Sequence, residues 1–438
     1  MLNMIIKLEN CPICKENKWH DLDYLRSHKY WYDLDLREEG EAVGFKICKE
    51  CGFCTYDYVN DKRLETSYNQ ARPVMTANHI ITCNRKNEYH RAFLKDVEIE
   101  GPFLDVGCAQ GSFLNDLREN RAYEKVTKIE DCDTYYGTEW SKAFANYGRH
   151  EYGIQITQEI DIRYIYNFVS YYHVLEHIQH PDKELERIKT VMRDDALLYI
   201  SVPLWFDVLE EWSGSFLRDW ENYLHLNHVN VFSKQSFHNL LNNAGFEIIK
   251  EDEALYGYTV LCKRGEKKDI VKEDYKIQQQ ILEANKKAIE LVDPIVNKPQ
   301  EAYKVFSKFP DAYFLHAMNK DNMKNFEAQK AILEEGLKQC PNSSRLINQL
   351  AKMYFQWDES TPEKMHYSNH IKKAEELFKK CIEMKPGVED SCYFLALIES
   401  RYKKNQKKAV EYMKETIRIN PQRFTESWNM ICLFYKDA

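Results

Sequence analysis

Short apolar runs alternate with amphipathic helical patterns between about residues 101 and 264. A short apolar run rich in β-branched and aromatic residues predicts a strand, whereas apolar residues spaced three and four apart predict a helix. On this basis we expect strands at 103–106, 135–139, 168–172, 197–202, 247–253 and 258–263. Strands that alternate with helices are typical of an α/β fold in which helices cover a parallel sheet.

The end of this region departs from the alternation. Too few residues join the runs at 247–253 and 258–263 for a crossover helix, so we expect these two strands to form an antiparallel hairpin. Ser233 is suited to cap the start of the helix that precedes them, and Gly245 is suited to end it.

The pattern is helical from about residue 270 to residue 438, with almost no strand candidates. Prolines recur there about every 34 residues, with one longer interval, at Pro310, Pro341, Pro386 and Pro421. This period resembles that of tetratricopeptide repeats. The resemblance implies that paired helices approach at small residues, namely Ala331, Ala374 and Ala409. A generic helical bundle is the alternative.

Two C-x2-C pairs lie within the first 60 residues. Two such pairs bring four thiolates within reach of one Zn²⁺, and we expect the ligands to be Cys11, Cys14, Cys48 and Cys51. Cys54 is then a spare cysteine. A site closed by four thiolates has no open position, so the zinc would be structural. The alternative is that these cysteines are unpaired core residues.

Composition narrows the function classes. A formal net charge of -8 and a pI near 6.0 exclude the basic surface that binds nucleic-acid phosphates. No apolar run approaches the ~20 residues of a membrane span, and the first residues lack the apolar core of a signal peptide. We therefore expect a cytoplasmic protein whose cysteines are reduced.

The apolar run at 103–106 ends in a turn of small residues, "GCAQG", before helical spacing resumes. Such a turn lets a ligand lie against backbone N–H groups at a helix N-terminus. A Cβ at Gly107 or Gly111 would occupy the space of that ligand. Glu139, at the end of the next strand, is placed to bind the ribose hydroxyls of a nucleoside cofactor.

The pattern D-x-G-x-(G/A)-x-G that begins at Asp105 resembles motif I of class I S-adenosylmethionine-dependent methyltransferases. Further stretches resemble other parts of that family: "YGTEWS" its second-strand acid, "NFVSYYHVLEHIQHPDKELERI" its fourth strand, and "LLYISVP" its fifth. The match covers about residues 85 to 264. It implies a Rossmann-like seven-stranded methyltransferase sheet with S-adenosyl-L-methionine as cofactor.

The resemblance also implies which residues contact the cofactor. They are Asp105, Gly107, Cys108, Ala109, Gly111, Phe113, Glu139, Trp140, Tyr172 and His173.

The segment "HVLEH" follows the strand at 168–172 and, in this family, faces the transferred methyl. His177 or Glu176 can accept a proton or hold a metal there, and His228 is a second candidate base. One alternative is that a histidine only packs or caps. Another is the H-x-x-E-H zinc motif of a metallopeptidase class, which needs a long helix.

The chain is thus expected to hold four parts: a zinc ribbon (1–60), a helical connector (61–100), a methyltransferase domain (101–264, with an insertion near 204–227) and tetratricopeptide-like helices (270–438). A zinc-binding domain followed by a methyltransferase domain with "VLEH" resembles the arrangement in methyltransferases that act on sugars, polysaccharides and natural products. We therefore expect a sugar, glycan or other small-molecule acceptor. The alternatives are a protein methyltransferase whose helical tail recruits a protein partner, and a non-catalytic interaction protein.

Overall fold

A computed structural model of the chain describes residues 5–27, 43–60, 68, 77–119, 126–127, 134–204, 227–254, 257–360, 367–384 and 389–436. The expected insertion near 204–227 lies outside the described residues, apart from its two ends. The chain forms two compact units, which are Met1–Pro73 with Leu94–Val296, and Val74–Phe93 with Asn297–Ala438. Each unit is described here by itself.

The first unit is built around a seven-stranded sheet with the strand order β10-β9-β7-β11-β12-β15-β14. In chain order its strands are β7 (Phe103–Val106), β9 (Tyr135–Thr138), β10 (Gln155–Thr157), β11 (Tyr166–Tyr172), β12 (Met192–Val202), β14 (Phe246–Ala254) and β15 (Gly257–Arg264). Only β15 runs antiparallel to its neighbours. This confirms the Rossmann-like fold class and the closing hairpin; β10 was not predicted.

Helices cover both faces of the sheet. They are α3 (Ser112–Glu119), α4 (Lys142–Tyr147) with the π-helix Gly148–Tyr152, α5 (Pro181–Lys189) and α7 (Lys234–Asn243). Side chains of β12 point alternately to the two faces of the sheet. Leu198 and Ile200 join the core that contains α5 and α7, while Tyr199 packs on Phe113 of α3.

The ends of α7 follow the prediction. The Ser233 side chain accepts a hydrogen bond from the Ser236 N–H, and Gly245 follows the helix with a left-handed φ of 72°.

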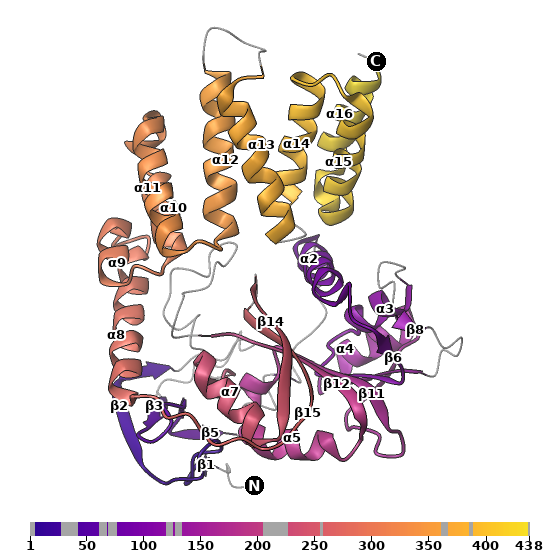
Figure 1. The fold of residues 1–438 in the computed structure, drawn as a ribbon, viewed down its shortest axis with the longest axis vertical. Coiled ribbons are helices and arrows are strands. Elements are labelled where there is room, and N and C mark those ends of the chain that lie inside the picture. Colours follow the sequence, from indigo (N-terminus) through magenta and orange to yellow (C-terminus); the bar gives the residue numbers. More distant parts are fainter. Residues whose placement is uncertain are drawn as a thin grey trace. The chain divides into compact units, whose positions relative to one another are not determined.

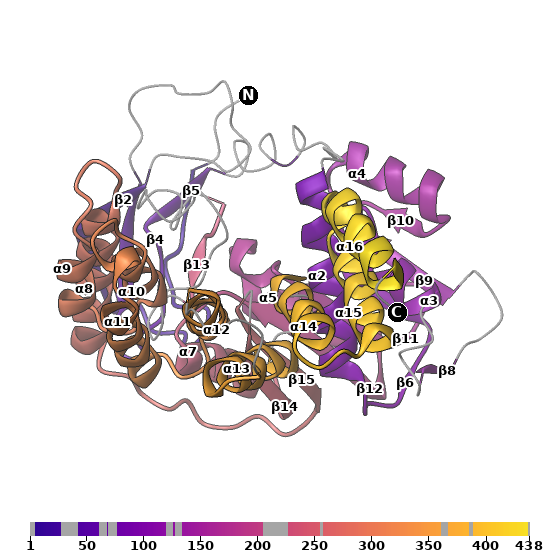
Figure 2. The ribbon, with the colours of Figure 1, turned by 90° about the horizontal axis from the view of Figure 1, so that it is seen from above.

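We call the described residues between 5 and 60 the ribbon. Its strands are β1 (Ile5–Lys7), β2 (Trp19–Ser27), β3 (Val43–Cys48), β4 (Cys54–Tyr56) and β5 (Tyr58–Asn60). The sheet β13-β4-β3-β2 takes its fourth strand, β13 (Asn230–Val231), from the segment after the sequence insertion (Figure 2). Ribbon residue Phe53 also packs against Phe232. The ribbon and the seven-stranded sheet therefore share one hydrophobic core.

Two further elements complete the first unit. The short strands β6 (Ile99–Glu100) and β8 (Val126–Thr127) pair in parallel. Helix α8 (Tyr275–Val292) packs against the ribbon, where the Tyr275 ring lies 5.5 Å from that of His20. The compact unit therefore extends beyond residue 264, to Val296.

The described part of the second unit is helical. Its helices are α2 (Ala77–Leu94), α9 (Pro299–Val305), α10 (Pro310–Ala317), α11 (Phe326–Gln339), α12 (Ser344–Glu359), α13 (Asn369–Met384), α14 (Glu389–Arg401), α15 (Gln406–Ile419) and α16 (Phe424–Lys436), with 3-10 turns at Asn322–Lys324 and Pro421–Arg423. Helices α12 to α16 lie side by side in chain order (Figure 1). Helix α2, distant in sequence, packs near the end of α15 through an ion pair between Glu88 and Arg418.

The contacts correct one residue of the expected repeat. Ala374 and Ala409 are fully buried, but Ala331 is exposed. The buried residue at the matching distance from the following proline is Gln329. The close approach in α11 occurs instead at Gly336, where a Cβ would lie 2.8 Å from Leu346 Cδ1. The tetratricopeptide interpretation itself stays a prediction.

Candidate active site

The turn between β7 and α3 has an unusual backbone. Gly107, Ala109 and Gly111 have φ values of 68°, 49° and 76°, in the left-handed region that favours glycine. The Cys108 N–H donates to the Thr138 carbonyl oxygen at 2.9 Å, which ties the turn to the end of β9. The alternating conformation folds the chain back sharply above the sheet and begins α3 at Ser112.

The protein's own packing excludes a Cβ at Gly107 but leaves room for one at Gly111. A Cβ on Gly107 would lie 2.6 Å from Val174 Cγ2, and one on Gly111 would lie 3.4 Å from Ile156 Cδ1. The expectation that these Cβ atoms would occupy the ligand's space stays a prediction, but at Gly107 the chain's own Val174 side chain already excludes a Cβ. Gly107 lets the turn lie directly against the segment that follows β11.

Two carboxyl groups lie at different depths around the turn. Glu139 accepts hydrogen bonds from the Ala109 N–H at 3.0 Å and the Ser141 N–H at 2.7 Å. Burial raises the pKa of Glu139, although these backbone hydrogen bonds oppose the rise. Asp105 lies deeper and accepts a hydrogen bond from Ser170 Oγ at 2.7 Å. Burial raises the pKa of Asp105 to about 7.

Some of the other predicted cofactor residues are buried beneath this turn, and others lie exposed beside it. Cys108 and Phe113 are buried beneath it. Trp140 is 52% exposed, and its ring meets the edge of the Tyr68 ring at 5.9 Å. The Tyr68 ring also lies 5.8 Å from that of His177. Tyr68, which carried no motif in the sequence, thus lies between a predicted cofactor residue and a predicted catalytic one.

The residues of "HVLEH" gather around one buried carboxylate. Glu176 has no exposed surface, and its Oε1 lies 3.3 Å from His173 Nδ1 and 3.6 Å from His177 Nε2. The ring of His228 lies 4.8 Å from that of His177. His173 has a left-handed φ of 57° at the end of β11. The structure therefore brings together the three predicted catalytic residues, Glu176, His177 and His228.

Burial also acts on the protonation of His177. It lowers the pKa of this imidazole, while the neighbouring Glu176 opposes the shift. A His177 side chain with a lowered pKa is neutral at cellular pH and can accept a proton or bind a metal.

Two backbone segments hold this cluster. The His177 Nδ1–H donates to the Asn227 carbonyl oxygen at 2.6 Å, because a carbonyl can only accept. Asn230 Nδ2 donates to the carbonyl oxygens of Leu175 and Ile178, at 3.0 and 2.6 Å. The turn that carries Glu176 is thus tied to the segment that carries His228.

The metallopeptidase alternative does not fit this geometry. That motif places its two histidines on one long helix. Here Leu175–His177 form a single 3-10 turn, and Pro181 begins the next helix. The pattern H-x-x-E-H therefore arises from a strand end followed by a tight turn.

The four predicted zinc ligands converge in the ribbon. The sulfur atoms of Cys11 and Cys51 lie 3.6 Å apart, and those of Cys14 and Cys48 lie 3.4 Å apart. Four thiolates bound to Zn²⁺ in a tetrahedron, each at about 2.3 Å, are separated by about 3.8 Å. The spacing fits this ion and is too long for disulfides. Cys54 is buried in β4 and does not belong to the cluster.

Replacing Cys48 with serine is expected to remove one tightly bound zinc per chain and to lower the melting temperature, because the ribbon shares its core with the seven-stranded sheet. Metal analysis after dialysis against a mild chelator measures the loss. Cys54→Ser is the matched control, a buried ribbon cysteine whose loss should leave the zinc in place. Equal zinc content in the parent and Cys48→Ser would refute the assignment.

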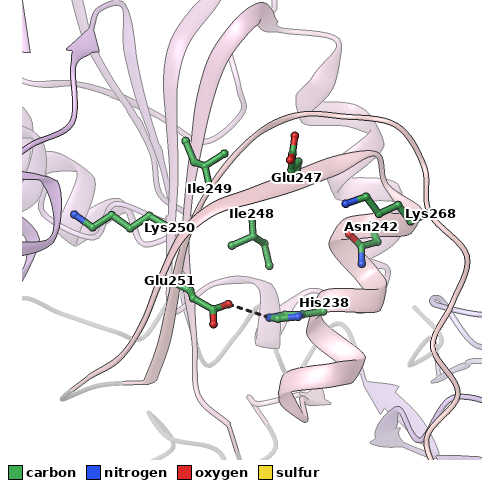
Figure 3. A pocket seen from close by; sticks show the side chains of 8 residues that line it. All are labelled: His238, Asn242, Glu247, Ile248, Ile249, Lys250, Glu251 and Lys268. Carbon is green, nitrogen blue, oxygen red and sulfur yellow. Dashed lines mark ion pairs between the residues drawn. The ribbon is translucent and has the colours of Figure 1, made fainter.

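A pocket between α7 and β14 lies apart from these groups (Figure 3). His238 Nε2 lies 3.6 Å from Glu251 Oε2 there. None of the predicted site residues lines this pocket. Within the described parts of the chain, no helix has both the length and the apolar character of a membrane span.

Comparison with known proteins gives one family match and several similar structures. Residues 79–251 match the family described as "Methyltransferase domain". No curated protein matches the chain. One similar structure is the complex of the Haloferax volcanii Trm112 methyltransferase activator with a methyltransferase, at 11% identity and a TM-score of 0.33, covering 43% of this chain and 93% of that chain.

Two others are methyltransferases. The mitomycin 7-O-methyltransferase MmcR is 17% identical with a TM-score of 0.33, covering 47% of this chain and 58% of its own. An S-adenosylmethionine-dependent methyltransferase from Aquifex aeolicus is 19% identical with a TM-score of 0.29, covering 43% of this chain and 98% of its own. The family match identifies residues 79–251 as a methyltransferase domain, and with it the chain as a methyltransferase enzyme.

Proposed function

We propose that this methyltransferase transfers the methyl group of S-adenosylmethionine to a hydroxyl of a sugar, glycan or other small-molecule acceptor. The observation that carries the proposal is the His177 imidazole. Its Nδ1–H is fixed by the Asn227 carbonyl, and its Nε2 lies beside the buried Glu176. A neutral imidazole in that setting suits an acceptor that loses a proton as the new bond forms.

The cofactor lies, in this proposal, over the turn between β7 and α3. Its amino-acid end lies against the turn, and Glu139 binds its ribose. Asp105 supports the turn from below through Ser170. Trp140 and Tyr172 flank the bound molecule, which directs the sulfonium methyl toward His173 and Glu176.

The transfer itself needs placement and proton removal. The positive sulfur already makes the methyl group electrophilic, so the protein has to align the acceptor oxygen with the C–S bond. His177 takes the proton of the acceptor, and Glu176 stabilises the resulting imidazolium. His228 is the second candidate for this role.

A protein acceptor is the competing proposal. The stacked helices of the second unit, if they are tetratricopeptide-like, offer a surface that could recruit a protein target. Incubation of the enzyme with methyl-labelled S-adenosylmethionine and a cell extract separates the two. Label in the small-molecule or polysaccharide fraction supports our proposal, whereas label confined to the protein fraction refutes it. A His177→Ala enzyme should label none of the fractions appreciably.

Replacing Glu139 with alanine is expected to weaken S-adenosylmethionine binding by about 1.5–3 kcal/mol, or about 10–150-fold, because a charge-assisted hydrogen bond to the ribose is lost. Calorimetric titration measures the change. Glu139 also accepts hydrogen bonds from Ala109 and Ser141, so Glu139→Gln serves as the control that keeps the size of the side chain. Parent affinity in Glu139→Ala would exclude the ribose contact.

A further inference from the structure

We propose that Glu176, His177 and His228 form a binding site for a divalent transition-metal cation, separate from the four cysteines of the ribbon. One ligand atom from each residue lies within 4.8 Å of the others. The inference rests on the proposed function in one respect, that the cation lies where the acceptor oxygen would meet the methyl group.

The spacing of the ligand atoms fits a shared ion. Two nitrogen or oxygen ligands bound to Zn²⁺ in a tetrahedron, each at about 2.0–2.2 Å, are about 3.3–3.6 Å apart. His177 Nε2 and Glu176 Oε1 are 3.6 Å apart before any ion draws them together. The His228 ligand atom lies within 4.8 Å of those of the other two residues.

The orientation of His177 is that of a metal ligand. A metal-bound histidine usually donates its other ring N–H to a carbonyl or carboxylate, which fixes the tautomer and the plane of the ring. The hydrogen bond from His177 Nδ1 to the Asn227 carbonyl does this, so Nε2 carries the lone pair on the side of Glu176. Asn227 is also the residue next to His228, so one segment supplies both the orienting carbonyl and the third ligand.

The negative charge of the buried Glu176 also favours a bound cation. Glu176 is completely buried, and a carboxylate removed from water is costly unless positive charge lies beside it. A divalent cation would supply that charge at the point where the carboxylate and the two imidazoles meet.

The ligand types restrict the ion. Two imidazoles and one carboxylate suit Zn²⁺, Co²⁺, Fe²⁺ or Mn²⁺ rather than Mg²⁺ or Ca²⁺, which prefer sites built from oxygen atoms. Three protein ligands leave at least one position open for a substrate oxygen. The ribbon, in contrast, offers four thiolates and no open position.

The ribbon also supports this second site. Strand β13 begins two residues after His228 and pairs with β4 of the ribbon, where Thr55 Oγ1 donates to the Val229 carbonyl at 2.9 Å. Asn230 on the same strand is bonded to the turn that carries Glu176. The folded ribbon therefore positions His228 against the other two ligands.

The cation would act on the acceptor without changing its own oxidation state. The acceptor hydroxyl binds the open position and loses its proton to water, which leaves a bound alkoxide. The alkoxide oxygen attacks the methyl carbon, the C–S bond breaks, and its electron pair stays on sulfur. The products are the methyl ether and neutral S-adenosylhomocysteine. In this form of the reaction His177 holds the cation instead of accepting the proton.

Titration with Co²⁺ of the full chain that keeps one zinc per chain after dialysis against a mild chelator, followed by visible absorption, tests the site. We expect one further equivalent to bind with the weak d–d bands of nitrogen and oxygen ligands, without the intense charge-transfer band of thiolates. Glu176→Gln and His228→Ala should each weaken Co²⁺ binding by more than about 100-fold. Loss of a residue that only orients a ligand weakens metal binding by about 10–100-fold. His238→Ala should bind normally, because His238 also lies beside a glutamate, Glu251, but the described residues place no third ligand with them.

Absence of this second equivalent in the parent protein would overturn the proposal, and so would equal Co²⁺ affinity in Glu176→Gln and the parent. Melting curves and calorimetric titration with S-adenosylmethionine are run on every variant, so that unfolding is recognised. Parent protein that binds S-adenosylmethionine but no Co²⁺ refutes the cation site alone. Parent protein that binds Co²⁺ but no S-adenosylmethionine refutes the proposed function instead.

Discussion

Replacing His177 with alanine is expected to lower the rate of methyl transfer by about 10²–10⁴-fold, the usual effect of losing a general base. The affinity for S-adenosylmethionine should stay at the parent value, because our proposal places His177 against the acceptor and not against the cofactor. The ring is held by Asn227 and lies beside Glu176, so the variant removes the lone pair to which we assign the proton or the cation. Single-turnover kinetics with saturating cofactor measures the effect.

His238→Ala is the matched control for this variant. His238 is a partly buried histidine of the same unit that lies beside a glutamate, and it lines the pocket between α7 and β14. Its removal should leave the rate within a few-fold of the parent. If His177→Ala and His228→Ala both turn over at nearly the parent rate, placement of the substrates alone accounts for catalysis.

Replacing Gly107 with alanine is expected to abolish measurable binding of S-adenosylmethionine. The new Cβ would lie 2.6 Å from Val174 Cγ2, so either the turn or the segment after β11 has to move. Gly107 also has a left-handed φ of 68°, which alanine adopts at a cost of about 1 kcal/mol. Both effects displace the turn against which, in our proposal, the cofactor lies. Calorimetric titration measures the loss of affinity.

Gly153→Ala separates the two effects. Gly153 has a similar φ of 63°, but a Cβ there would meet nothing within 4 Å. This variant should lose about 1 kcal/mol of stability and bind S-adenosylmethionine like the parent. If Gly107→Ala binds the cofactor as tightly as Gly153→Ala does, the turn is not the cofactor site.

Local patterns were sufficient to predict much of the first unit. Apolar runs bounded by turns marked six strands of the sheet, since buried parallel strands are nearly continuous in hydrophobicity. The short link after β14 revealed the hairpin, and the two C-x2-C pairs revealed the cysteine cluster. Residues close in sequence mark each strand, the hairpin and each C-x2-C pair, and the shared preference of the four thiols for one metal ion links the two pairs.

Features that depend on distant segments could not be predicted in this way. Strand β13 is only two residues long and exists because β4 of the ribbon pairs with it. Strand β10 is short and has an exposed residue at each end, so its sequence "QIT" has little hydrophobic signal. Tyr68 approaches His177 only through the fold. Ala331 fitted the repeat in residue type, but its distance from the following proline differs from that of the other two alanines.

Calorimetric titration of the full chain with S-adenosylmethionine tests the methyltransferase assignment most directly. We predict saturable binding of one cofactor per chain, competition by S-adenosylhomocysteine, and no binding of NADH. Saturable NADH binding together with no heat from S-adenosylmethionine, in protein with a cooperative melting transition, would contradict it.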